Sequence, residues 1–308
     1  MNTSDTTNTC ANCGKEGSDV NNTCNKCKQV KYCNAACKKK HRHKHKKDCE
    51  EHQRLAAEQA AKLHDEKLFK HPPPSDDCPI CFLRLPYLGT GNRYMTCCGK
   101  SICSGCSHAP VYDNQGNQVD DKTCPFCRTP PTTDEELIVR LKKRIEAGDA
   151  RAMHNIGICY RDGKNGYPVD HTKALELLHR AGELGHAIAY ACIGYNYDGF
   201  SRGAEVDKKK ARHYYELAAM GGDVCARHNL GISEEDTGNW DRALNHHMIA
   251  VRGGYSDSLR SIKQLYADGH ASKEDYTKAL QSYQEYLGEI KSDQRDEAAA
   301  AQEDYRYY

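Results

Sequence analysis

Small and apolar residues recur at matched positions through the second half of the chain. Glycines mark the repeat at intervals of 37, 37 and 32 residues, at Gly148, Gly185, Gly222 and Gly254. Four residues after each marker stands a small residue: Ala152, Ala189, Ala226 and Ser258. Later in each unit comes a basic residue followed by alanine: Lys173-Ala174, Lys210-Ala211, Arg242-Ala243 and Lys278-Ala279. A period in this range, with small residues at fixed places, is typical of stacked pairs of helices. The pattern predicts an α-solenoid of about four helical hairpins over residues 134–290.

The repeat also varies in ways that locate its ends. Nine residues after the markers stand Gly157, Gly194, Gly231 and Lys263, and twelve after stand Tyr160, Tyr197, Glu234 and Tyr266. The third unit therefore lacks the tyrosine, and the fourth lacks the glycine. A divergent last unit is typical of a capping repeat, and residues 137–146 are expected to cap the other end.

Before the repeat, the chain consists of shorter segments of contrasting character. Residues 1–9 are rich in Asn and Thr and are expected to be a disordered lead. Residues 50–75 begin with strong helix formers and end in the run HPPPS, which predicts a connector helix and a proline-rich linker. A second proline break at 129–133 precedes the repeats, and residues 291–308 are expected to be a flexible tail.

Charge and cysteine content limit the binding partners, the compartment and the cysteine chemistry that the chain is expected to have. Lys and Arg number 44 against 43 Asp and Glu, so the net charge of +1 predicts no strong field toward nucleic acid or a membrane. The sequence has no apolar signal-peptide core and no run of 18 apolar residues, which favours an intracellular protein, cytoplasmic or nuclear, without a membrane segment. In a reducing compartment its 18 cysteines are expected to bind metal. A disulfide framework, the alternative, would require a secretory signal.

Cysteines and a histidine are spaced as metal ligands from residue 10 to residue 49. A C-x-x-C pair lets two thiolates converge on one ion from a tight turn, and two pairs complete the tetrahedral shell that structural zinc prefers. C-x-x-x-C and H-x-x-x-C steps place two ligands on one face of a helix. The candidates are Cys10, Cys13, Cys24, Cys27, Cys33, Cys37, His45 and Cys49.

This spacing resembles the MYND-type zinc finger over residues 10–49. The resemblance implies a cross-brace in which Cys10, Cys13, Cys33 and Cys37 hold one zinc, and Cys24, Cys27, His45 and Cys49 the other. Family spacing favours His45 over His41 or His43, and Arg42 stands where members usually carry an aromatic residue. MYND modules bind short proline-containing peptides. The basic run at 38–47 is interpreted as a solvated helix face, with a nuclear-import or anionic-partner patch as the alternative.

A second series of C-x-x-C pairs, called hooks below, occupies residues 76–129 and consists of Cys78 and Cys81, Cys103 and Cys106, and Cys124 and Cys127. This series resembles a RING-type zinc finger. The resemblance implies one zinc on Cys78, Cys81, Cys103 and Cys106, and a second zinc that includes Cys124 and Cys127. Lys100 stands in the slot where most members have a ligating histidine, and a protonated amine cannot ligate. Cys97 and Cys98 are the best substitutes, which would make an all-cysteine variant. If only one of them reaches the metal, the site is incomplete and His108 is a remote alternative donor.

The RING resemblance also implies a contact surface for a ubiquitin-conjugating enzyme. Ile80 lies between the first two ligands, and Pro125 and Phe126 lie on the opposing hook. Arg128 falls where active members place a basic residue that clamps the ubiquitin thioester against the conjugating enzyme. The alternative is that the apolar residues only pack the finger and Arg128 is solvated.

The repeats resemble Sel-like repeats, relatives of the tetratricopeptide repeat. Their isolated cysteines, Cys159, Cys192 and Cys225, are expected to pack in the core, and their histidines to lie at or near the surface. The expected fold is therefore two small zinc-stabilised α+β modules, both cross-brace fingers, followed by an all-α superhelical solenoid of helical hairpins.

The sequence predicts a zinc-binding protein-interaction protein with about four zinc ions. The finer hypothesis is a RING-type ubiquitin ligase without covalent catalysis, which recruits a conjugating enzyme through the second finger and a target through the solenoid and the MYND finger. The alternative is a non-catalytic scaffold or adaptor. Nucleic-acid binding is disfavoured, because the hooks lack the paired histidines and recognition-helix spacing of DNA-reading fingers.

Overall fold

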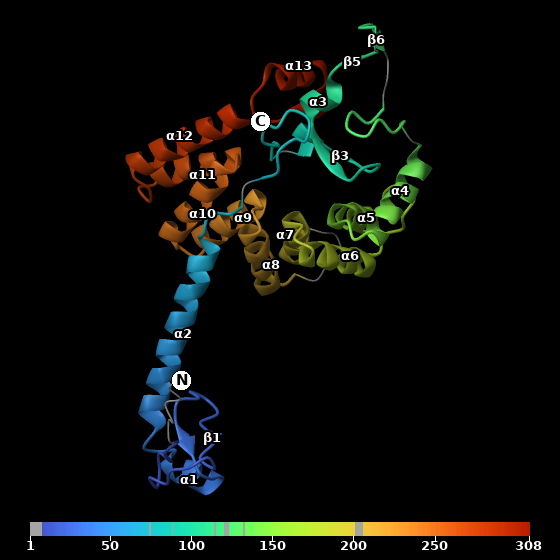
Figure 1. Cartoon of the computed structure of the whole chain (residues 1–308). Helices are drawn as coiled ribbons and strands as arrows, with labels where there is room; N and C mark the ends of the chain where they lie inside the picture. The colour runs from blue at the N-terminus through green and yellow to red at the C-terminus, as the bar shows by residue number, and fades with distance from the viewer. Residues whose placement is uncertain are drawn as a thin grey trace, which may run out of the picture. The chain divides into compact units, whose positions relative to one another are not determined.

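A computed structural model of the chain describes residues 8–73, 75–87, 89–113, 115–119, 123–131, 133–200 and 206–308. It forms two compact units, Met1–Leu68 and Phe69–Tyr308, coloured in sequence order in Figure 1. Residues 1–7 of the expected disordered lead, Pro74 of the linker and Thr132 of the second proline break lie outside the described residues.

The first unit holds the MYND-like segment and a long helix. Strand β1 (Asn22–Thr23) pairs with the antiparallel strand β2 (Lys31–Tyr32), and helices α1 (Ala35–His41) and α2 (Lys46–Leu68) follow. Its buried core consists of Cys10, Val20 and Tyr32. A core of this size is too small to stabilise a domain alone, so bound metal must supply part of the folding free energy. Helix α2 corresponds to the predicted connector.

The second unit begins with the second cysteine-rich segment, called the second finger below. A 3-10 turn, η1 (Gly89–Gly91), leads into strand β3 (Asn92–Met95), which pairs with the antiparallel strand β4 (Lys100–Cys103). Helix α3 (Ser104–His108) follows directly, and strands β5 (Val111–Tyr112) and β6 (Gln118–Val119) form a separate hairpin. Leu85 and Ile102 are buried among the cysteines of the finger.

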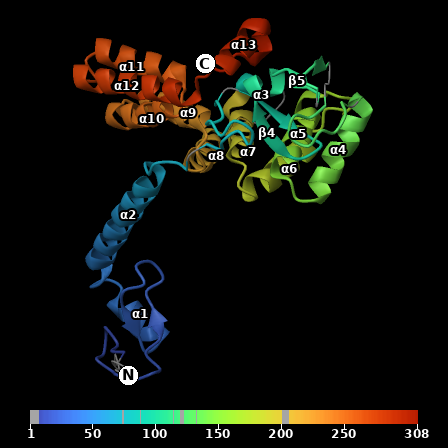
Figure 2. The same ribbon diagram turned by 45° about the horizontal axis from the view of Figure 1, so that its top comes forward.

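Helical hairpins make up the rest of the second unit, as the repeat predicted (Figure 2). Helix α4 (Asp134–Glu146) stands in the place of the expected leading cap. The hairpins are α5 (Ala150–Asp162) with α6 (His171–Glu183), α7 (Ala187–Tyr195) with α8 (Lys208–Met220), α9 (Val224–Glu235) with α10 (Trp240–Arg252), and α11 (Ser256–Ala267) with α12 (Lys273–Ile290). A π-helical turn, η2 (Asn196–Phe200), extends α7. Helix α13 (Asp293–Ala301) and a 3-10 turn, η3 (Glu303–Tyr305), complete the chain.

The marker glycines end helices. Gly148, Gly185, Gly222 and Gly254 have φ angles of 79°, 90°, 98° and 94°, a left-handed conformation in which a side chain is strained. After Gly148 and Gly222, an aspartate side chain caps the next helix by accepting from its backbone N–H groups. The repeated small residues Ala152, Ala189, Ala226 and Ser258 are all fully buried, which lets the helices approach closely.

In the first three units, the glycine nine residues after the marker makes room for a side chain of the partner helix, which is Leu178 opposite Gly157. A Cβ on Gly194 would lie 2.6 Å from the Tyr215 ring, and one on Gly231 would lie 2.5 Å from the His247 ring. These glycines therefore set the distance between the two helices of a hairpin.

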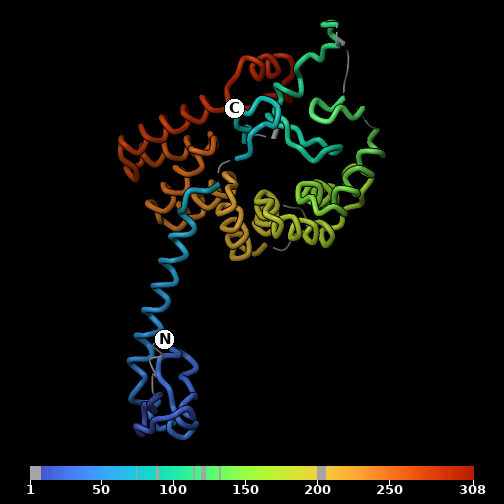
Figure 3. Tube along the Cα trace, in the orientation of Figure 1, coloured from blue at the N-terminus to red at the C-terminus, as the bar shows by residue number. Residues whose placement is uncertain are grey.

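The C-terminal segment differs from the expected flexible tail over 291–308. Helix α13 lies beside α3 of the finger in Figures 1 and 2, and the trace in Figure 3 returns to the finger at its end. Arg295 and Tyr307 are buried, and Thr90 donates a hydrogen bond to the backbone oxygen of Arg306 (2.5 Å). The acidic, alanine-rich sequence has no periodic apolar face, so composition alone does not reveal a packed helix.

The repeat histidines also differ from expectation in one place. His246 and His247 on α10 are fully buried, rather than lying at or near the surface. The ring of His246 packs 4.7 Å from that of Phe69, and His247 accepts or donates a hydrogen bond with Ser258 and Glu235. Cys159 is buried as predicted, whereas Cys192 and Cys225 are half-buried.

Among the described residues, no helix combines the length and apolar character that a membrane span requires.

Candidate metal centres

Four C-x-x-C hooks share one backbone geometry. The residue that follows each hook has a left-handed conformation: Gly14 (φ 75°), Lys28 (60°), Phe82 (58°) and Arg128 (58°). In each case its N–H donates to the carbonyl of the hook's first cysteine, at distances between 2.7 and 3.1 Å. This turn brings the two sulfurs of a hook to the same side. Only one of the four positions is glycine, so the residue types do not reveal the left-handed turn.

In the first finger, the first group consists of Cys10, Cys13, Cys33 and Cys37, whose sulfurs all lie within 4.8 Å of one another. The Sγ atom of Cys33 lies 3.7 Å from that of Cys13 and 3.6 Å from that of Cys37. Thiolates bound ~2.3 Å from a tetrahedral zinc lie roughly 3.8 Å apart, so the group fits that ion. Asn34 caps α1 by accepting from the Cys37 N–H (2.8 Å), which fixes Cys37 in the first turn.

The second group of this finger consists of Cys24, Cys27, His45 and Cys49. Cys24 and Cys49 have their sulfurs 3.7 Å apart, and the Cys27 sulfur lies 3.2 Å from Nε2 of His45. His45 is buried, while His43 is exposed and Nδ1 of His41 lies 3.2 Å from the Tyr32 hydroxyl. The structure therefore brings His45, rather than either neighbouring histidine, to the cysteines.

In the second finger, Cys78, Cys81, Cys103 and Cys106 form a largely buried group. The Cys81 and Cys103 sulfurs are 3.7 Å apart. The backbone N–H groups of Cys103 and Cys106 donate to the sulfurs of Cys78 (3.5 Å) and Cys103 (3.4 Å). Because Cys103 is also the N-cap of α3, this helix places two ligands and stabilises thiolate charge at the same time.

Cys97, Cys98, Cys124 and Cys127 form the remaining group, also within 4.8 Å. Cys98 lies 3.9 Å from Cys124, and Cys97 lies 3.4 Å from Cys127, measured between sulfurs. Gly99 follows Cys97 and Cys98 with a left-handed backbone (φ 71°), and this tight turn lets both sulfurs reach the group. His108 is not part of the group, since its ring packs 5.7 Å from that of Tyr305. The Nζ atom of Lys100 lies 6.0 Å from the centre of the Phe126 ring.

In each of the four groups one thiol has a lowered pKa, while at least one other has a raised pKa because of burial and its neighbouring thiols. Burial raises the pKa of Cys24, but backbone N–H groups of Cys27 and Lys26 outweigh it, and the pKa falls to about 6. The pKa of Cys127 is also lowered to about 6, chiefly by the hydroxyl of Thr129. Thiolates that form near neutral pH bind zinc with little competition from protons.

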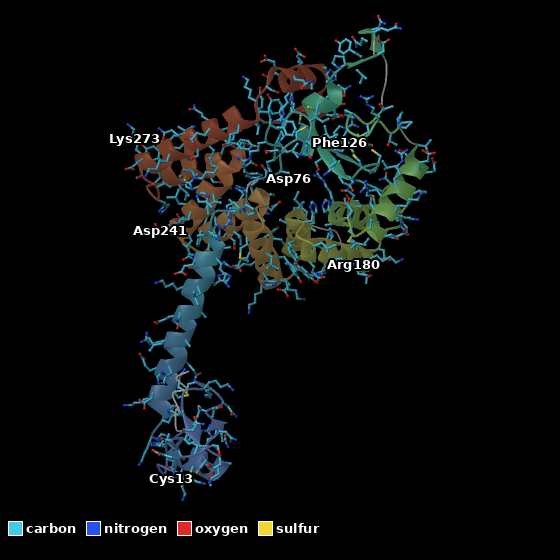
Figure 4. The ribbon with its side chains drawn as sticks, viewed as in Figure 1. Cys13, Asp76, Phe126, Arg180, Asp241 and Lys273 are labelled. Carbon is cyan, nitrogen blue, oxygen red and sulfur yellow. The ribbon has the colours of Figure 1, made fainter. Side chains whose placement is uncertain are left out.

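The four groups are compatible with zinc. Cysteine sulfur with one histidine nitrogen is the donor set of structural zinc, and each group has the four ligands of a closed site. Figure 4 marks Cys13 in the first finger and Phe126 in the second.

The expected conjugating-enzyme contacts lie at or near the surface of the second finger. Ile80 is 36% exposed and Phe126 is 44% exposed, Arg128 is exposed, and Pro125 is half-buried. Phe82, which the sequence interpretation did not single out, is 77% exposed. It follows the first hook directly, at the left-handed position.

Comparisons with known proteins agree with the two modules that the hooks and glycines describe. The MYND finger model matches residues 10–49, and the Sel1 repeat model matches residues 150–186 and 189–223. The chain contains a MYND finger and Sel1 repeats. The hairpins α9–α10 and α11–α12 continue the array beyond the matched repeats.

Similar curated proteins match only in part. The chain is 37% identical over 102 residues to the ERAD-associated E3 ubiquitin-protein ligase component HRD3B of Arabidopsis thaliana, covering 32% of this chain and 15% of that protein. It is 37% identical over 70 residues to the E3 ubiquitin-protein ligase GW2 of Oryza sativa subsp. indica, covering 22% and 14%. The match therefore spans about one seventh of each relative's length.

Among solved structures, a Sel1 repeat protein from Oxalobacter formigenes is 25% identical, with a TM-score of 0.43 over 57% of this chain and 68% of that one. MYND fingers and Sel1 repeats are protein-interaction modules. The chain is thus a zinc-finger and repeat protein.

Proposed function

We propose that this protein is a RING-type ubiquitin ligase. Its second finger would bind a ubiquitin-conjugating enzyme through Ile80, Pro125 and Phe126, and Arg128 would hold the ubiquitin thioester in place. The contribution of such a finger is positioning, because the protein itself forms no bond to ubiquitin. The solenoid and the MYND finger would bind the target. Its free cysteines suit a reducing compartment, the cytoplasm or the nucleus.

The observation that carries the proposal is the chemistry of the third residue in the four hooks that share the left-handed turn. The common turn leaves this residue exposed or near the surface in both fingers. In the first finger it is polar, Asn12 and Lys26, and in the second it is apolar, Ile80 and Phe126. Apolar side chains held at the surface on two metal-fixed turns suit a protein partner. The ligase names of the partial relatives support the same function.

An autoubiquitination assay across a panel of conjugating enzymes tests the proposal. Ile80→Ala should abolish most activity, while Ile188→Ala, at a residue 41% exposed on α7, should leave it unchanged. Arg128 has a left-handed backbone, so Arg128→Asn is preferable to alanine because asparagine tolerates that conformation. Lys28→Asn changes the equivalent residue of the first finger and serves as its control.

Activity that survives both Ile80→Ala and Arg128→Asn would overturn the site assignment. A complete absence of activity with every conjugating enzyme would favour the non-catalytic adaptor, in which both fingers are structural. Lys100 in the histidine slot is the feature of the chain that favours this second candidate.

A further inference from the structure

The two candidate metal-binding groups of the second finger contain cysteine only, so a bound zinc would leave each group with a net negative charge. A zinc ion bound by four thiolates is a dianion. Cys78, Cys103, Cys106 and Cys124 are each at most 5% exposed, so most of this charge would lie away from water. Buried charge is costly unless a cation or hydrogen-bond donors offset it.

Arg295, near the start of α13, brings a buried cation to the first of these groups. Its side chain is fully buried, and Nη2 donates to the Cys81 sulfur at 3.8 Å. Nη1 donates to the backbone oxygens of Arg84 (2.8 Å) and Ile290 (2.6 Å), which fixes the plane of the guanidinium. Ser292 caps α13 by accepting from the Arg295 N–H, so the helix start holds the residue in register.

No carboxylate among the described residues forms an ion pair with Arg295, and its Nε, buried, has no hydrogen-bond partner among them. A buried guanidinium without an acidic partner is unfavourable unless another anion is close. The thiolates of the first group are that anion. The backbone of α13 also lies close to helix α3 of the finger, because a Cβ on Gly105 would lie 3.0 Å from the backbone nitrogen of Arg295.

Arg144, on α4, reaches the second group from the other end of the solenoid. Its Nη2 donates to the backbone oxygen of Cys97 (2.8 Å), and its Nε donates to that of Thr96 (3.3 Å). Gly99 makes room for it, since a Cβ there would lie 2.8 Å from Nη1 of Arg144. Arg144 therefore holds the turn that carries the adjacent pair Cys97 and Cys98.

We propose that the two ends of the solenoid form an outer coordination shell for the second finger. Arg295 offsets thiolate charge at the Cys78, Cys81, Cys103 and Cys106 group, and Arg144 positions Cys97 and Cys98 in the other. Both are positioning residues, and neither ligates metal. The inference rests on zinc binding by the second finger, and it does not require ubiquitin transfer. The solenoid is then needed for metal retention as well as for partner binding.

Zinc release from the full-length chain to a competing chromogenic chelator tests the proposal. We expect Arg295→Met to weaken retention of one ion on the order of 10- to 100-fold, which is typical for loss of an outer partner. Arg295→Lys keeps the charge and loses the planar fork, so its loss should be smaller. The two ions of the MYND finger are an internal reference, and Arg260→Met, at an exposed residue of α11, is the control variant.

A pair of double variants identifies which ion is affected. Cys98→Ser removes a ligand of the second group, so adding Arg295→Met should release one further ion, whereas adding Arg144→Met should release none. Cobalt in place of zinc gives a second readout, because its absorption bands report thiolate coordination directly.

Equal retention in Arg295→Met and wild type would overturn the proposal. So would an equal loss in Arg295→Met and Arg295→Lys, because that result would assign Arg295 to packing alone. Helical circular dichroism of each variant shows whether the solenoid remains folded. Absence of ligase activity in the wild type, together with the expected zinc loss from Arg295→Met, would instead count against the proposed function only.

Discussion

The guanidinium of Arg295 lies 3.8 Å from the sulfur of Cys81, across 214 residues of sequence. A residue of helix α13 thus contacts one of the cysteine groups of the second finger. The same finger is contacted from α4 by Arg144 and from α5 by Arg151, whose guanidinium donates to the Ser101 hydroxyl and to Asn92. The second finger and the repeats therefore belong to one compact unit.

Zinc counting by native mass spectrometry should give four ions per chain, one for each ligand group. Cys98→Ser should give three, because a group with three remaining ligands binds zinc more weakly. Cys192→Ser is the matched control, since Cys192 is half-buried in the repeats and belongs to no ligand group among the described residues, and it should give four. Three ions in the wild type would mean that Cys97 and Cys98 do not complete a site.

Gly194→Ala should destabilise the solenoid by about 1–3 kcal/mol, because its methyl group would overlap the Tyr215 ring. Gly288→Ala is the control on α12, where no atom lies within 4 Å of the added carbon. That change should be neutral or stabilising by up to about 1 kcal/mol, since alanine has the higher helix propensity. Thermal unfolding followed by helical circular dichroism measures both. Equal stability of the two variants would contradict the close helix approach.

Glu234 stands where the other units carry tyrosine, and it replaces ring packing with a buried charge network. Its carboxylate accepts from Arg212 (2.5 Å), Arg242 (3.0 Å) and Asn239 (2.8 Å). Burial raises its pKa, but these donors outweigh burial and lower the pKa to about 2.

Glu234→Gln should therefore cost about 1.5–3 kcal/mol near neutral pH, the usual contribution of hydrogen bonds to a charged group. Because the pKa is lower in the folded state, this stabilisation is present above pH 4.5 and is lost as the pH falls toward 2. The difference between variant and wild type should shrink accordingly. Glu274→Gln breaks an exposed pair with Lys278 and should change stability by less than about 1 kcal/mol.

His246 should make the solenoid sensitive to acid. Burial, with the nearby charge of Arg227, lowers its pKa to about 3 from 6.5. Since the folded pKa is the lower one, stability is full above pH 6.5 and falls below it, as the unfolded chain takes up a proton that the folded chain excludes. At pH 5 the loss is roughly 2 kcal/mol.

The melting temperature of wild type should therefore fall more between pH 7 and pH 5 than that of His246→Leu. His246 belongs to none of the four candidate ligand groups, so we expect both proteins to release zinc in acid alike and the difference between them to report the histidine. Parallel melting curves would show that His246 is hydrated rather than buried.

Sequence periodicity was sufficient to predict the solenoid, because the residues that specify each hairpin act locally and recur in each unit. Gly148, Gly185, Gly222 and Gly254 have to adopt left-handed backbone at helix ends, and this requirement repeats with the hairpin. The cross-brace grouping came from the family resemblance, and the structure brings together the same cysteines and His45. The assignment of those residues as ligands stays a prediction.

The docking of the finger could not be predicted, because it depends on single residues without a period. Arg295 lies in a mildly acidic stretch, and nothing in its neighbours marks it as buried. His246 likewise carries a polar side chain on a helix face that turns out to be packed against Phe69. The left-handed turns after the hooks were equally hidden, since lysine, phenylalanine and arginine rarely adopt that conformation.

The contact between Arg295 and Cys81 can form only late in synthesis of the chain. Cys81 leaves the ribosome 214 residues before Arg295, so a nascent finger can load its metal long before its counter-charge exists. A polypeptide released early by a nonsense codon would carry a finger with weaker hold on zinc. The metal content of the finger would thus report whether synthesis has passed Arg295, and products that end before it would be the first to lose zinc.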